Sequence, residues 1–164
     1  MKALAIIAAL AATPAAADSF TVWQHDQWTV EYLDTSCALT GLDMSSSMRF
    51  LLLGEENDIF SFILEVPAGS GAQDVINITT ARPRYLNHDM RIDGQVWRLD
   101  IDGAFWGDNP GTLVIASIGT SYDFRAAIAH GRWMSGYGGL LFDLTGSAEA
   151  LSVLEACRQK LGTW

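Results

Sequence analysis

The two cysteines of this 164-residue chain, Cys37 and Cys157, constrain its fold more than any other sequence feature. Cys157 belongs to an apolar stripe with helical spacings of three and four, formed by Ala150, Leu151, Leu154, Cys157 and Leu161. A cysteine on such a face is either an inert buried thiol or half of a disulfide. A Cys37–Cys157 disulfide closes a loop of most of the chain, which stabilises a fold by roughly 4 to 5 kcal/mol in the chain-entropy model. We expect this disulfide, with two free buried thiols as the alternative.

The same C-terminal stretch predicts a strand followed by a helix. Residues 140–144 form an apolar run of strand length, and Thr145-Gly146-Ser147 interrupts it. Ser147 suits the N-cap of the helix because its hydroxyl can accept a hydrogen bond from a first-turn amide. Gly162 follows the last apolar position, as is typical of a helix C-terminus. We expect this final helix to close over upstream β-structure.

The N-terminus has the three parts of a secretory signal peptide. Lys2 supplies the positive charge, residues 3–12 are apolar, and Pro14-Ala15-Ala16-Ala17 offers a small-residue cleavage site. We expect removal of residues 1–17, which leaves a single β-rich domain over residues 18–164. No later apolar run approaches the roughly 18 residues that a membrane-spanning helix needs. The sequence therefore predicts a bacterial periplasmic or secreted protein, in a compartment where disulfides persist.

Acidic residues outnumber basic ones by 19 to 10, giving a formal net charge of −9. Loss of Lys2 with the signal peptide leaves 9 basic residues and a charge of −10. Such a surface repels nucleic acid and anionic lipid at ordinary salt concentrations, so neither is an expected partner. The charge suits a cationic protein or cell-envelope component, although solubility alone is the simpler explanation.

Short runs of alternating or β-branched apolar residues predict a mainly β protein of the α+β type. The clearest alternation is in residues 28–33, where Trp28, Val30 and Tyr32 share one face. Further strands are expected at residues 19–22, 48–53, 59–66, 75–80 and 112–118. The predicted architecture is an antiparallel β-sandwich or squashed barrel of eight to ten short strands. Two short helices are expected near the C-terminus, the last one tethered by the disulfide.

Short polar sequences predict where the chain turns between strands. Asp93-Gly94 and Asp102-Gly103 each separate two apolar runs, and such pairs predict tight hairpin turns because both turn positions need positive φ. His25-Asp26-Gln27 predicts another turn, between the first two strands. Residues 121–131 predict the first of the two helices, and residues 132–144 predict a last hairpin.

No catalytic or metal-binding motif emerges. His25, His88 and His130 lie in separate segments without metal-ligand spacing. Asp100-Ile101-Asp102-Gly103 resembles the start of a calcium loop but lacks the third ligand and the closing glutamate. No G-x-S-x-G motif marks a nucleophilic serine. We therefore predict no catalytic residue, no metal and no cofactor.

Six tryptophans are many for this length, and exposed aromatic side chains suit the binding of a sugar or a protein partner. Trp28 and Trp97 lie within apolar strand patterns and are expected in the core. Trp106 precedes a polar turn and Trp133 precedes a glycine-rich turn that contains Tyr137. Trp106, Trp133 and Tyr137 are therefore the candidate binding surface.

Two motifs stand out near the ends of the expected mature chain. Trp28-x-Val30 is followed by Cys37, and the C-terminus reads Leu144-x-Gly146-Ser147-x-x-Ala150-Leu151-x-x-Leu154-x-x-Cys157. These motifs resemble the invasion-associated locus B-like proteins of bacteria. The resemblance implies a small secreted or periplasmic β-rich domain with no established catalytic residues, associated with cell-surface interaction or stress tolerance.

Three hypotheses for function follow. The first is a non-enzymatic periplasmic binding or interaction protein, indicated by the export signal, the disulfide and the lack of catalytic spacing. The second is an acidic inhibitor of a cationic cell-wall hydrolase such as lysozyme, indicated by the charge and by Ser135-Gly136-Tyr137 on a projecting hairpin. The third is a hydrolase whose Ser, His and Asp are brought together only by folding.

Overall fold

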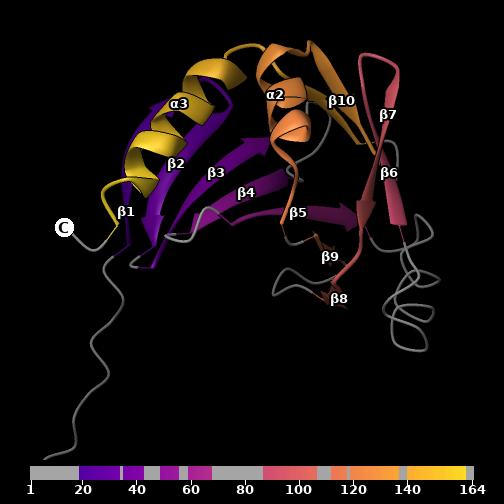
Figure 1. The fold of residues 1–164 in the computed structure, drawn as a ribbon, viewed down its shortest axis with the longest axis horizontal. Coiled ribbons are helices and arrows are strands. Elements are labelled where there is room, and N and C mark those ends of the chain that lie inside the picture. The colour runs from indigo at the N-terminus through magenta and orange to yellow at the C-terminus, as the bar shows by residue number, and fades with distance from the viewer. Residues whose placement is uncertain are drawn as a thin grey trace, which may run out of the picture.

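The computed structural model describes residues 19–33, 35–42, 49–55, 59–67, 87–106, 112–117, 119–136 and 140–161 (Figure 1). The predicted signal peptide and the predicted strand at residues 75–80 lie outside these ranges. The described residues form two antiparallel sheets and two helices, which confirms the predicted fold class. None of the described helices is both long enough and apolar enough to cross a membrane.

The larger sheet has seven strands in the order β1-β2-β3-β4-β5-β9-β8. Its strands are β1 Ser19–His25, β2 Trp28–Leu33, β3 Ser36–Leu42, β4 Arg49–Glu55, β5 Phe60–Pro67, β9 Thr112–Ser117 and β8 Gly103–Trp106. The smaller sheet has four strands in the order β11-β10-β6-β7. Its strands are β11 Leu141–Asp143, β10 Trp133–Ser135, β6 Asn87–Ile92 and β7 Gln95–Asp100. The described residues thus hold eleven strands, one more than the predicted maximum.

The first hairpin shows how alternation builds the seven-stranded sheet. Asp26, with a φ of 50°, lies in the two-residue turn that pairs His25 with Trp28. Trp28, Val30 and Tyr32 then point into the core, with exposed fractions of 1%, 0% and 7%. Buried side chains of both sheets and both helices belong to one hydrophobic cluster, so the two sheets share a core.

The two Asp-Gly pairs have different structures. Asp93 and Gly94 adopt positive φ (48° and 86°) and join β6 to β7, which confirms that hairpin. The prediction of a hairpin at Asp102-Gly103 is wrong, because β7 pairs with β6 whereas β8 pairs with β9 in the other sheet. Asp102 lacks the positive φ that the tight turn requires. The preceding Ile101 is only 3% exposed, and its burial takes the chain from one sheet to the other.

Helix α2 (Tyr122–His130) begins where the sequence predicted it. The Ser121 hydroxyl accepts a hydrogen bond from the Phe124 amide, so Ser121 is the N-cap. Phe124 and Ile128, one turn apart, are fully buried. This apolar stripe fixes α2 against the core.

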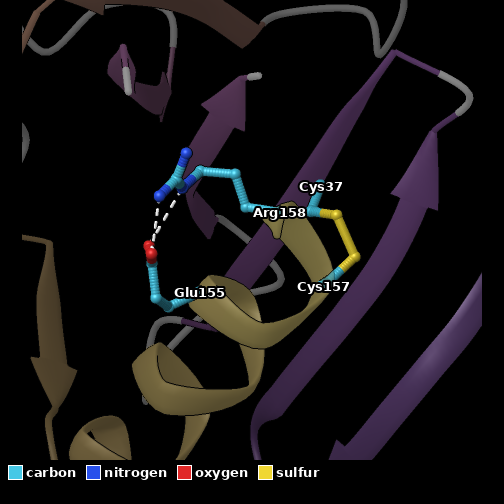
Figure 2. The surroundings of a disulfide bond; sticks show 4 residues. All are labelled: Cys37, Glu155, Cys157 and Arg158. Carbon is cyan, nitrogen blue, oxygen red and sulfur yellow. Dashed lines mark hydrogen bonds and ion pairs between the residues drawn. A yellow bond between two sulfur atoms is a disulfide. The ribbon is translucent and has the colours of Figure 1, made fainter. Parts of the chain in front are cut away.

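Helix α3 (Ser147–Arg158) lies across β2, β3 and β4, and it buries Ala150, Leu154 and Cys157 (Figure 1). Figure 2 shows Cys157 bonded to Cys37 of β3. The two Cα atoms are 6.1 Å apart, although the residues are separated by 120 positions in the chain. The predicted disulfide is confirmed, and it fastens the last helix to the third strand.

The start of α3 differs from the prediction. Gly146, with a φ of 86°, is the N-cap, and Ser147 is the first helical residue. The Ser147 side chain is fully buried, and its hydroxyl donates a 2.7 Å hydrogen bond to the Ile128 carbonyl of α2. The Trp28 indole also donates to the Thr145 carbonyl at 2.7 Å. The hydroxyl of Ser147 therefore joins two helices instead of capping one.

Replacing Ser147 should weaken this junction. We expect Ser147→Ala to lower the unfolding free energy by about 1 to 2 kcal/mol, because it removes a buried hydrogen bond and leaves a carbonyl less satisfied. Chemical denaturation of the variant and the wild type measures the difference. Ser152→Ala, at an exposed position of the same helix, is the matched control and should change stability by less than about 0.5 kcal/mol. Equal effects of the two variants would contradict the assigned role of Ser147.

Acid should loosen the ion pair near the end of α3. Arg158 donates hydrogen bonds to Glu155 at 2.6 and 3.0 Å (Figure 2), and these hydrogen bonds hold the pKa of Glu155 below its ordinary value of 4.5. The stabilisation is therefore complete above pH 4.5 and is lost as the pH falls through the lowered folded-state pKa. Because the Glu155 side chain is 40% exposed, we expect an effect within about 1 kcal/mol.

Urea unfolding of the wild type and of Glu155→Gln tests this pH dependence. At neutral pH the wild type should be the more stable protein, because only its carboxylate is charged. The difference in unfolding free energy should shrink as the pH is lowered well below 4.5. A difference that stays constant over this range would show that the ion pair does not contribute.

Candidate functional site

The tryptophans separate into core and surface positions. Trp28 is 1% exposed, as predicted, and Trp97 is partly buried against the core. Trp133 is 43% exposed on β10, which fits its selection as a surface residue. Trp106 lies on β8 at the edge of the other sheet, but its side chain and the whole of Tyr137 lie outside the described part of the structure.

Trp133 belongs to the outward side of the four-stranded sheet. Along these strands every second side chain faces the core, including Met90, Ile92, Met134 and Phe142, which are at most 4% exposed. The side chains between them face outward. We call this surface the outer face; it consists of Asp89, Arg91, Val96, Arg98, Trp133, Ser135, Leu141 and Asp143.

The strand register places one row of the outer face across all four strands. Ser135 of β10 pairs with Leu141 of β11 on one side and with Arg91 of β6 on the other. Arg91 in turn pairs with Val96 of β7. Side chains directly opposite one another in such a ladder are about 5 Å apart. Trp133 lies two residues before Ser135 on β10. Its side chain therefore faces the same side of the sheet and borders this row.

The outer face carries three exposed apolar side chains. Seven large hydrophobic side chains are strongly exposed in the described part of the chain. Three of them, Val96, Trp133 and Leu141, lie on this one surface with exposed fractions of 43%, 43% and 41%. Leu141 and Trp133 lie on the neighbouring strands β11 and β10, whereas Val96 lies at the other end of the row, beyond Ser135 and Arg91.

Asp93 holds the backbone of Trp133 in place. The sequence predicted only that Asp93 belongs to a turn. One oxygen of its carboxylate accepts hydrogen bonds from the backbone amides of Arg132 and Trp133, at 3.1 and 3.0 Å. The Asp93 amide donates to the Trp133 carbonyl at 3.0 Å. The hairpin turn of β6 and β7 therefore positions the start of β10. No sequence signal marks this contact, because it joins residues 40 positions apart.

The carboxylates of the outer face have partners within the protein. Asp89 accepts a 3.2 Å hydrogen bond from Arg98. Asp143 accepts hydrogen bonds from the hydroxyl and the amide of Thr145, at 2.7 and 2.8 Å, and these bonds lower the pKa of Asp143. Arg91, in contrast, is exposed and its guanidinium has no hydrogen bond or ion pair with a described residue.

One small cleft brings a histidine near a carboxylate. His130, Asp93, Gln95 and Trp97 line a cavity of about 200 Å³ between α2 and the β6–β7 hairpin. Both Asp93 oxygens already accept backbone hydrogen bonds, and no serine or cysteine is among the described lining residues. The described residues of this cleft therefore do not form the Ser, His and Asp arrangement of the third hypothesis.

The other predicted polar residues do not gather into a site in the described structure. His25 Nδ1 lies 3.7 Å from Oδ2 of the adjacent Asp26, and both side chains are largely exposed. The His88 side chain lies outside the described residues. No group of three or more His, Cys, Asp or Glu side chains within the described ranges is arranged to hold a metal ion.

Comparison with known proteins identifies no further functional residue. No family model, no curated protein and no solved structure matches the chain. The functional interpretation therefore depends on the composition and geometry of the outer face.

Proposed function

We propose that this chain is a non-enzymatic binding protein of the bacterial cell envelope, and that the outer face of the four-stranded sheet is its contact surface. The observation that carries this proposal is the exposure of Val96, Trp133 and Leu141 on one side of the four-stranded sheet. Exposed tryptophan and arginine side chains are typical of protein interfaces. The outer face has both, with Trp133 beside the row that contains Arg91.

A binding role agrees with the shape of the molecule. Enzymes and small-molecule receptors use concave pockets, commonly of about 300 to 1,000 Å³. The outer face is instead the surface of a four-stranded sheet, and the cavities beside His130 and beside Ser152 of α3 hold about 200 and 290 Å³. A sheet surface with exposed apolar side chains suits contact with another macromolecule.

The periplasm or the cell exterior is the proposed location. The disulfide supports it, because such bonds persist in oxidising compartments and are rare in the cytosol. The predicted signal peptide and the resemblance to invasion-associated locus B-like proteins support the same location. They also support a role in contacts at the cell surface.

Co-sedimentation with isolated cell envelopes of the source bacterium tests this function. We expect saturable binding by the wild type, and Trp133→Ser should weaken it about tenfold, because tryptophans at interfaces commonly dominate affinity. Tyr122→Ser is the matched control, since Tyr122 is 76% exposed on α2 and lies off the outer face. It should change the affinity less than about twofold. Equal binding by all three proteins, or no binding by the wild type, would overturn the proposal.

A further inference from the structure

We infer that the segment bound at the outer face belongs to an acidic protein, and that it presents a carboxylate to Arg91 beside an apolar side chain. This inference rests on the proposed function and specifies the chemistry of the partner. It differs from the cationic partner that the net charge of −9 suggests. The argument depends on which charges of the outer face already have partners.

The carboxylates of the outer face already accept hydrogen bonds from other residues of this chain. The Asp89 carboxylate is paired with Arg98, and the Asp143 carboxylate accepts two hydrogen bonds from Thr145. The neighbouring Asp93 carboxylate accepts hydrogen bonds from two backbone amides. A cationic partner would therefore meet an Asp89 that already pairs with Arg98, an Asp93 with both oxygens occupied, and an Asp143 that accepts both Thr145 hydrogen bonds on one oxygen.

Arg91 forms no ion pair with any residue that the structure describes. Its guanidinium is exposed, lacks a hydrogen-bond partner among the described residues, and lies in the row between Ser135 and Val96. A guanidinium binds a carboxylate through two parallel hydrogen bonds, and these bonds are stronger than those between neutral groups. Arg132 adds a second exposed guanidinium next to Trp133 in the chain. Arg91 can therefore bind a carboxylate without breaking a contact with any described residue.

The apolar neighbours define the rest of the partner. Val96 pairs with Arg91 across the strands, and Leu141 lies beyond Ser135 in the same row. Every second side chain of an extended peptide points the same way, at spacings of about 6.6 to 6.8 Å. A segment with an acidic and an apolar residue two positions apart can therefore reach Arg91 and an apolar neighbour together.

Screening allows this local pattern to outweigh the net charge. At an ionic strength of about 0.15 M, exposed charges farther apart than about 8 Å interact weakly. An anionic membrane is a less suitable occupant, because it would bring a whole surface of negative charge against this acidic protein. A single acidic segment meets only the charges of the outer face.

Two synthetic peptides test this inference by NMR titration at millimolar concentration. One is acetyl-Glu-Ser-Leu-Ser-Glu-amide, and the other carries lysine in place of both glutamates. The readout is the indole N–H signal of Trp133 in ¹⁵N-labelled full-length mature protein, assigned by its loss in Trp133→Phe. We expect the glutamate peptide to shift this signal at physiological salt, and the lysine peptide to shift it much less.

Arg91→Gln should weaken binding of the glutamate peptide about tenfold, because the charge-assisted hydrogen bonds are lost. This variant should fold normally, since Arg91 has no described partner to lose. Lys160→Gln makes the same charge change at an exposed position just past α3, and should weaken binding less than about twofold. Equal losses in the two variants would indicate only a general charge effect and would overturn the inference.

Three further outcomes would also overturn the inference. They are a larger Trp133 shift with the lysine peptide, no shift with either peptide, and a shift only with vesicles of phosphatidylglycerol. If envelope binding still depends on Trp133 in these cases, the proposed function stands and only the partner chemistry is wrong. If Trp133→Ser leaves envelope binding unchanged, the proposed function itself fails.

Discussion

A Cys37→Ala/Cys157→Ala double variant is expected to lose roughly 4 to 5 kcal/mol of unfolding free energy. The disulfide joins residues 120 positions apart, so it restricts the unfolded chain over most of its length. Such a loss is comparable to the whole stability of a marginal domain, and much of the double variant should be unfolded at physiological temperature. Urea denaturation followed by circular dichroism measures the difference.

Reduction provides the matching control for the double variant. Dithiothreitol should destabilise the wild type by a similar amount and leave the double variant unchanged. Both cysteine residues are buried, with exposed fractions of 0% for Cys37 and 2% for Cys157, so reduction should require opening of the fold. A loss of less than about 1 kcal/mol would mean that the disulfide does not hold α3 in place.

Phe50→Ala is expected to lower the unfolding free energy by about 3 to 5 kcal/mol, because it removes a fully buried ring. The Phe50 ring lies 5.5 Å from that of Phe62 in the same sheet and 5.0 Å from that of Phe142 in the four-stranded sheet. It also fills the space beside Gly41, where an added Cβ would lie 2.5 Å from the ring. Phe50 therefore joins the two sheets.

A double-mutant cycle isolates the contact between the sheets. Phe50→Ala and Phe142→Ala should each be strongly destabilising, and the cycle should give a coupling energy of about 1 kcal/mol. Tyr122→Ala serves as the surface control, because Tyr122 is 76% exposed, and should change stability by less than about 0.5 kcal/mol. Strictly additive losses would show that the two rings do not stabilise one another.

The folding of β11 links the core to the outer face. Phe142 points inward to Phe50, whereas its neighbours Leu141 and Asp143 point outward. The same alternation places Met134 in the core and Trp133 on the surface. The aromatic core therefore sets the orientation of the strands that display the proposed binding residues.

Local sequence patterns were sufficient for much of the fold. The alternation of Trp28, Val30 and Tyr32 predicted a strand with one buried face, and these side chains are buried. Cys37 was the single available partner for Cys157, so the disulfide could be predicted without knowing the path of the chain between them. The strand could be predicted from six consecutive residues, and the disulfide from the presence of only two cysteines.

Long-range pairing could not be predicted in the same way. Asp93-Gly94 and Asp102-Gly103 have the same composition, but only the first joins two paired strands. At the second pair, the buried Ile101 leads the chain from β7 to the other sheet. The burial of Ile101 depends on the whole core, which local sequence does not reveal. Ser147 was assigned a capping role for the same reason, because its partner Ile128 belongs to another helix.

The candidate surface also depends on long-range strand pairing that the sequence does not reveal. Exposure of Trp133 was predicted from its neighbouring glycines, but the row that it borders depends on β10 pairing with β6. Arg91 and Leu141 are 50 positions apart in the sequence and come together only through Ser135 of β10. The sequence therefore indicated one residue of the surface, and the sheet register supplied the others.

Site-specific photo-crosslinking in living cells tests the binding role of the outer face most directly. Benzoylphenylalanine would replace Trp133, Leu141 or Val96 in turn, with Tyr122 as the exposed position off this surface. We expect irradiation to give one adduct of the same mass from all three outer-face positions, and none from position 122. Adducts from position 122 alone, or equal adducts from all four positions, would contradict a binding role for the outer face.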